Sequence, residues 1–235
     1  MKQKNIFIVE EKKKELWLAL INFAVLATAM VLLLKTVESN GIWEEPLLSL
    51  ALFFVFPVLF IKFFLKKKPR DYFWNIKKAR SQTEWALAVA LVFIFTIWLI
   101  VLKWEGSGSF WQGGTVKLLL FINTFLLPVV VFSQEFFFRG FLLKIFRRNW
   151  SAFWAVVIQA TLFTGFKLLT NVEINNLWRL IALWIISFLL GVIVLRFRSI
   201  VVSTVVYWIY LFLVDLYVVH GSNQFFLKMI VEKNI

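Results

Sequence analysis

Long apolar runs alternate with short polar or charged segments along the whole chain. A run of about 20 apolar residues is long enough to cross a hydrocarbon core about 30 Å thick as a helix. On this basis we predict about seven membrane-spanning helices, at residues 16–34, 46–65, 85–102, 116–144, 150–169, 177–195 and 199–219. The pattern therefore predicts an all-α, polytopic membrane helical bundle. Since no linker or internal repeat divides the sequence, residues 1–235 are expected to form a single membrane domain.

The composition strengthens this prediction. The 235 residues are 61% hydrophobic and 19% aromatic, and the mean hydropathy is +0.83, which is too apolar for an ordinary water-soluble domain. Cysteine is absent and His220 is the single histidine, so the chain offers neither disulfides nor a thiolate or multi-histidine metal site. We expect no metal and no cofactor.

The net charge of +13 would suit nucleic acid, but the basic residues lie beside apolar runs rather than in a separate soluble domain. Most of the 26 lysines and arginines fall in segments on the side of the N-terminus, if the predicted spans alternate. This asymmetry predicts a cytoplasmic N-terminus. The most basic loop, residues 62–80, is expected to lie at the membrane surface, where anionic headgroups can also bind. We expect membrane lipid and no nucleic acid as partners.

The segment QEFFFRG at residues 134–140 places an amide, a carboxylate and a guanidinium inside an apolar run. Such groups are costly within a membrane and usually have a functional reason. Because Glu135 and Arg139 lie four residues apart, they share one helix face and can form a hydrogen bond that lowers the cost of burial. The alternative is that they form only an intrahelical pair at the membrane boundary.

The segment QEFFFRGFL resembles the first motif of the CPBP family, which includes type II CAAX prenyl endopeptidases and bacteriocin-processing proteins. That motif is Glu-Glu-x-x-x-Arg, usually followed by glycine. Glu135, Arg139 and Gly140 match it, whereas Gln134 stands in place of the first glutamate.

Two further family motifs can be placed by spacing. In Phe-x-x-x-His, Phe163 matches and Lys167 takes the histidine position. In His-x-x-x-Asn, counted from the Ser-Ile pair at residues 199–200, Tyr207 takes the histidine position and Leu211 the asparagine position. The resemblance implies a CPBP-like core at about residues 116–219, in a bacterial cell membrane.

The family reaction needs a carboxylate base and imidazoles that transfer protons and stabilise an oxyanion. Gln134 cannot act as a base, and Leu211 has no polar side-chain atom. Lys167 carries a charge unless burial removes it, and Tyr207 is a poor base at neutral pH. These departures favour a degenerate, non-catalytic pseudo-protease that acts as a scaffold or binding partner for another membrane protein or lipoprotein.

Two other functions remain open. The first is an active intramembrane endopeptidase with an altered site, in which Glu135 is the base, Lys167 an electrostatic partner and Tyr207 an oxyanion donor. The second is a small transporter or channel component, which the lack of an inverted repeat disfavours.

Lys167 also suggests a structural role. Helix geometry places it at a membrane depth similar to that of Asp215 and within reach of Glu135. We therefore hypothesise a buried ion pair of Lys167 with Asp215 or Glu135. The alternatives are that Lys167 extends to the outer interface and that Asp215 is solvated at the end of its span.

Overall fold

A computed structural model of the chain describes residues 2–36, 43–72, 121–170 and 177–213. The first two ranges contain α1 (Lys2–Thr36), α2 (Glu44–Leu50), the π-helical segment η1 (Ala51–Val55), α3 (Phe56–Phe63) and the short 3-10 turn η2 (Pro69–Asp71). The last two contain η4 (Ile122–Leu126), α6 (Leu127–Glu135), η5 (Phe136–Leu142), α7 (Leu143–Asn149), α8 (Ala152–Thr170), α9 (Leu177–Phe197) and a final helical segment, Ile200–Leu213. The segments η4 and η5 are π-helical.

Five of these helices are long and apolar enough to cross a membrane: Glu10–Leu34, Glu44–Phe63, Ile122–Asn149, Ala152–Thr170 and Leu180–Phe197. The segment Ile200–Leu213 is apolar but shorter. The prediction of an all-α, polytopic membrane protein is thereby confirmed. The span predicted at residues 85–102 and the end of the last predicted span lie outside the described residues. The cytoplasmic position of the N-terminus stays a prediction.

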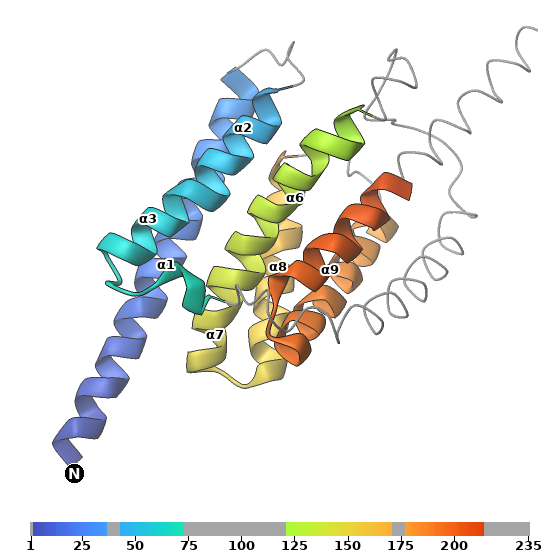
Figure 1. The fold of residues 1–235 in the computed structure, drawn as a ribbon. Helices are drawn as coiled ribbons and strands as arrows, with labels where there is room; N and C mark the ends of the chain where they lie inside the picture. The colour runs from blue at the N-terminus through green and yellow to red at the C-terminus, as the bar shows by residue number, and fades with distance from the viewer. Residues whose placement is uncertain (1, 37–42, 73–120, 171–176, 214–235) are drawn as a thin grey trace, which may run out of the picture.

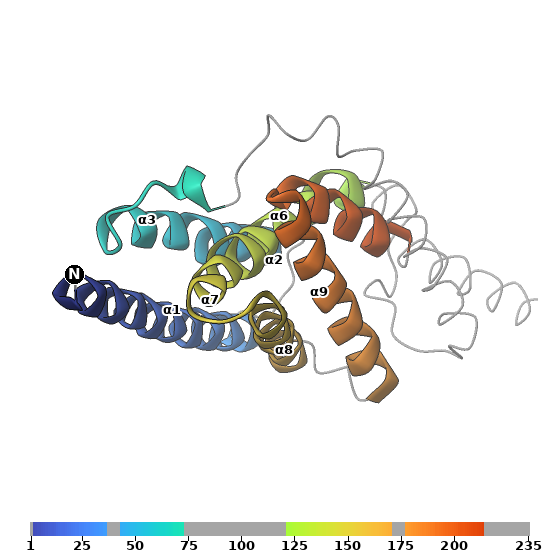
Figure 2. The same cartoon turned by 90° about the horizontal axis from the view of Figure 1, so that it is seen from below.

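The span Ile122–Asn149 is the centre of the bundle (Figures 1 and 2). Helix α1 and the α2–α3 span lie on one side of it, and α9 and the segment Ile200–Leu213 lie on the other, while α8 contacts both α1 and α9. Within its most apolar window 78% of the residues are buried, against 28–33% for the other four spans. The helix that carries the QEFFFRG segment is therefore enclosed by protein, whereas the surrounding helices expose one face.

Phenylalanines of the central helix build much of the core. The rings of Phe136, Phe137, Phe138 and Phe141 are fully buried. Phe138 illustrates their packing, because its ring centroid lies 5.0–6.0 Å from rings on α1, η1 and α8 at Phe23, Phe53, Phe163 and Phe166. Aromatic pairs at such distances add to the packing energy of the bundle. The phenylalanines of the motif thus pack neighbouring helices against the central helix.

Pro128 explains how the central helix is tied to the segment Ile200–Leu213. In η4, the Leu127 N–H bonds to the Ile122 carbonyl, five residues earlier. In the same register, residue 128 would bond to the Asn123 carbonyl, but proline has no N–H. The Trp208 indole N–H donates to this carbonyl instead, at 2.8 Å. Because Pro128 leaves the Asn123 carbonyl without a partner in its own helix, this carbonyl can accept a hydrogen bond from another helix.

Gly191 allows close packing of α8 against α9. A Cβ atom at this position would lie 2.9 Å from Val156 Cγ1 and 3.0 Å from Gln159 Oε1. Small residues at such points let helices in a membrane approach each other. A Cβ atom on Gly165, by contrast, would meet nothing within 4 Å.

We expect Gly191→Ala to be about 1–3 kcal/mol less stable than Gly165→Ala, because the added methyl group overpacks the α8–α9 contact. Both substitutions replace glycine by alanine within a helix, so both gain the same helix propensity. The difference between their free energies of unfolding therefore reports the steric overlap at Gly191. Equilibrium unfolding of the two variants in the same detergent measures this difference. Equal stabilities would contradict the close α8–α9 packing.

Candidate functional site

Glu135 and Arg139 form a fully buried ion pair in the central helix. Glu135 ends α6, Arg139 lies in η5, and both side chains have no exposed surface. Arg139 Nη1 donates a hydrogen bond to Glu135 Oε1. The bond expected from the four-residue spacing is therefore present. A π-helical segment inside an α-helix is often found at functional sites, which makes η5 notable.

Arg139 also connects the central helix to α8 and α9. Its Nη2 atom donates to the Ser187 hydroxyl on α9 at 3.1 Å. The Gln159 side-chain amide on α8 donates to the same hydroxyl at 3.3 Å. All three side chains are buried. One guanidinium thus organises polar groups from three helices.

Two aromatic rings enclose the guanidinium. Arg139 Cζ lies 4.9 Å from the ring centroid of Phe163 and 5.7 Å from that of Tyr207. The two rings are in turn edge-to-face, with centroids 6.0 Å apart. A cation over an aromatic face is stabilised, especially where water is excluded. The structure therefore brings Phe163 of α8 and Tyr207 of the last helical segment to the central ion pair.

Lys167 lies one turn beyond Phe163, with its amine 6.0 Å from the centroid of that ring. Within the part of the chain that the structure describes, Lys167 makes no ion pair with Glu135, and the carboxylate is paired with Arg139 instead. The predicted pair with Asp215 lies outside the described residues. Leu211 packs against the hydrophobic core and brings no polar side-chain atom to the site.

The site retains unused hydrogen-bonding capacity. Gln134 Oε1, Glu135 Oε2 and Arg139 Nε are buried and have no hydrogen-bond partner among the described residues. Leaving such groups unsatisfied costs about 1–3 kcal/mol each. Each of these atoms keeps the capacity for a further hydrogen bond: the two oxygens as acceptors and the nitrogen as a donor. Across the described ranges, no cluster of His, Cys, Asp and Glu side chains could hold a metal ion.

Residues 114–213 match the family model described as type II CAAX prenyl endopeptidase Rce1-like. This core is Rce1-like. The match includes Glu135, Arg139, Phe163, Lys167 and Tyr207, which are the residues placed by the resemblance to the CPBP family. Searches of curated proteins and of solved structures gave no match. The apolar helices show that the chain is an integral membrane protein, and residues 114–213 of it are similar to the CAAX protease family.

Gly140, which follows the arginine of the Rce1-like motif, has a steric role. A Cβ atom at this position would lie 3.2 Å from the Tyr72 backbone carbonyl. That carbonyl directly follows η2, outside the matched residues. A larger residue would require this carbonyl to shift by a few tenths of an ångström, so glycine favours the close approach of the chain after α3 to the central helix. The sequence alone could not identify this contact, because Tyr72 is distant in the chain.

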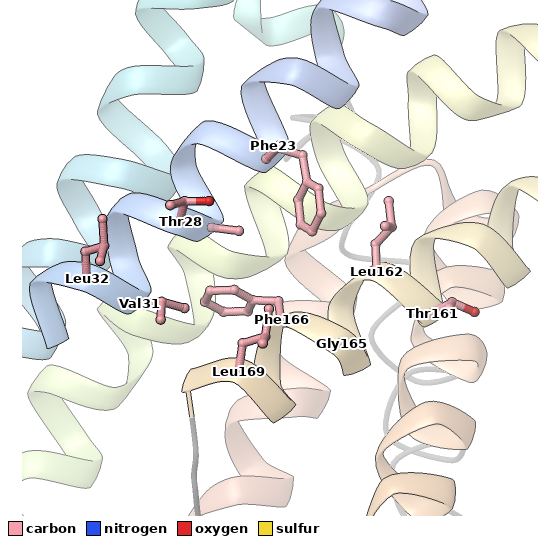
Figure 3. A pocket seen from close by; sticks show the side chains of 11 residues that line it. Phe23, Thr28, Val31, Leu32, Thr161, Leu162, Gly165, Phe166 and Leu169 are labelled. Carbon is pink, nitrogen blue, oxygen red and sulfur yellow. The ribbon is translucent and has the colours of Figure 1, made fainter. Parts of the chain in front are cut away.

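A lateral groove lies beside the Rce1-like core, between α1 and α8 (Figure 3). Its volume is about 380 Å³, and its lining is almost entirely apolar. Phe166 lines the groove and also packs on Phe138, with ring centroids 5.5 Å apart. The groove is therefore next to the phenylalanine core, and none of Glu135, Arg139 and Lys167 lines it. Sequence reasoning missed this groove, because nothing in either helix indicates that the two are neighbours.

Proposed function

We propose that the chain is a non-catalytic Rce1-like protein of the bacterial plasma membrane, which holds another membrane protein or lipoprotein. The proposal rests on two features of the site: Glu135 is paired with Arg139, and no histidine stands at the two histidine positions of the family motifs. One oxygen of this carboxylate accepts a hydrogen bond from Arg139. The two histidine positions of the family motifs are held by Lys167, which lies beside Phe163, and by Tyr207, which stacks on Arg139. This arrangement supports a structural ion pair better than a proton relay.

The lateral groove supports a binding surface for the partner. Ala24, Ala27 and Thr28 of α1 and Gly165 of α8 give it small side chains. Small residues allow a further membrane helix to pack closely, where dispersion and not water exclusion drives association. The partner must therefore offer a membrane helix that can pack in the groove, as does a single-span protein or a lipoprotein that has a helix next to its lipid anchor.

A second candidate function is an active endopeptidase with an altered site. It is favoured by Glu135 Oε2, which has no partner among the described residues and offers an acceptor for a water molecule. In this mechanism Glu135 would activate water, Lys167 would act electrostatically, and Tyr207 would donate a hydrogen bond to the oxyanion.

Affinity purification of the tagged protein in mild detergent tests the proposal. We expect one stoichiometric membrane partner with the wild type and with Glu135→Gln, after correction for the amount of folded protein. Gly165→Leu should release this partner, because it fills the groove at a position with open space. The control is Val192→Phe, which adds bulk at an exposed position of α9 and should retain the partner.

The two functions give different results in this experiment. A partner that is shortened by the wild type and left intact by Glu135→Gln would establish the endopeptidase. A partner that is retained by Gly165→Leu would show that the groove between α1 and α8 is not the binding surface.

A further inference from the structure

Charged side chains from three parts of the chain converge at the end of the bundle where α3 and α7 end. We define the basic cluster as Glu15, Lys67, Tyr72, Lys144 and Arg148. Glu15 of α1 accepts a hydrogen bond from the Lys67 amine at Oε1 and one from Arg148 Nη1 at Oε2, the latter at 3.0 Å. Both oxygens of this carboxylate are therefore used within the cluster.

Tyr72 is the centre of the basic cluster. Its side chain is fully buried, and its ring faces the Lys144 amine at 5.0 Å and Arg148 Cζ at 5.7 Å. Its hydroxyl makes no hydrogen bond of ordinary geometry among the described residues, although it interacts with the nearby Arg148 guanidinium. Burial raises the pKa of this hydroxyl, so that it remains a neutral O–H donor at neutral pH.

The positive charge of the basic cluster exceeds the charge of its one carboxylate. Lys67 and Arg148 both bond to Glu15, and Lys144 lies over the Tyr72 ring. Glu11 and Asp71 are exposed and interact electrostatically with Lys67 and Lys144, respectively. The side chains of Lys67 and Arg148 are only 29% and 30% exposed. Their proximity has an electrostatic cost, since burial and the Arg148 charge lower the pKa of Lys67 by more than the Glu11 charge raises it. A bound anion would remove this cost.

The position of the basic cluster identifies the kind of anion. Glu15 lies near the start of the first span, Lys67 follows the second, and Arg148 lies at the end of the central span. The cluster is thus at the level where the hydrocarbon core ends and lipid phosphates begin. Arginine and lysine are the usual ligands of phosphate oxygens. We propose that the basic cluster binds the phosphate of an anionic lipid headgroup, with Tyr72 donating a further hydrogen bond.

Native mass spectrometry of the full chain, titrated with phosphatidylglycerol or phosphatidylcholine, tests this proposal. We expect one preferred phosphatidylglycerol site. Lys144→Gln/Arg148→Gln should weaken it by about 30-fold, because each basic residue near a lipid phosphate is worth about 1 kcal/mol. The Glu15–Lys67 pair remains in this variant. Lys62→Gln/Arg147→Gln removes two exposed charges at the same end and should change binding by less than about 3-fold at high salt, where exposed charges are screened.

Tyr72→Phe is the second variant, because it retains every charge and the ring and removes only the hydroxyl. We expect it to weaken phosphatidylglycerol binding by about 10-fold, as for the loss of one hydrogen bond to a charged group. Equal losses in both double variants, or equal binding of the two lipids, would overturn the proposal. Displacement of the lipid by an equal concentration of inorganic phosphate would also overturn it, by assigning the site to a soluble phosphate.

Discussion

Arg139→Met is expected to lower the free energy of unfolding by about 3–5 kcal/mol, because it leaves the buried carboxylate of Glu135 without a counter-charge. Neither side chain of this pair has any exposed surface, so water cannot replace the guanidinium. The substitution also removes the donor to Ser187 and the cation between the rings of Phe163 and Tyr207. Equilibrium unfolding in detergent measures the loss.

The double variant Glu135→Gln/Arg139→Met is the control for this prediction. It removes both charges and approximates the volume of both side chains. We expect it to be more stable than Arg139→Met alone, because replacing a buried ion pair by neutral groups costs less than breaking it. If the double variant were as unstable as the single one, the loss would come from the packing of Arg139 and not from its charge.

Phe138→Ala is expected to destabilise the protein by about 3 kcal/mol or more. The ring of Phe138 has no exposed surface and contacts aromatic rings on α1, η1 and α8. In a membrane the loss comes from the cavity and from lost dispersion contacts, because lipid and not water surrounds the bundle. Thermal and denaturant unfolding of the purified variant measure the effect.

Phe125→Ala provides the comparison for the core substitution. Phe125 lies in the same span, but 61% of its surface is exposed. Its truncation leaves no closed cavity, so we expect a change within about 0.5 kcal/mol, as for a surface residue. Similar losses for Phe125→Ala and Phe138→Ala would contradict the central position of the motif helix.

The sequence was informative where chemistry depends on local spacing. Apolar runs identified the spans, because each must be long enough to cross the hydrocarbon core. The four-residue spacing of Glu135 and Arg139 predicted their hydrogen bond, and the motif spacing identified Phe163 and Tyr207, which both face the guanidinium.

Contacts between distant helices could not be predicted in the same way. Ser187 and Gln159 come together near Arg139 where α8 and α9 pack closely at Gly191, and the spacing of residues along the sequence does not indicate which helices are neighbours. Lys167 shows that a similar depth in the membrane does not establish a contact between two side chains. It was placed within reach of Glu135, but Arg139 on the same helix is closer and forms the ion pair.

The central proposal is that Glu135 is a structural residue and not a catalytic base. The most direct test is the intact mass of the co-purified partner, compared between cells that express the wild type and cells that express Glu135→Gln/Arg139→Met, which lacks the carboxylate without leaving a buried charge unpaired. We predict the same full-length partner mass in both. A shorter partner with the wild type alone would contradict the proposal and identify an active protease.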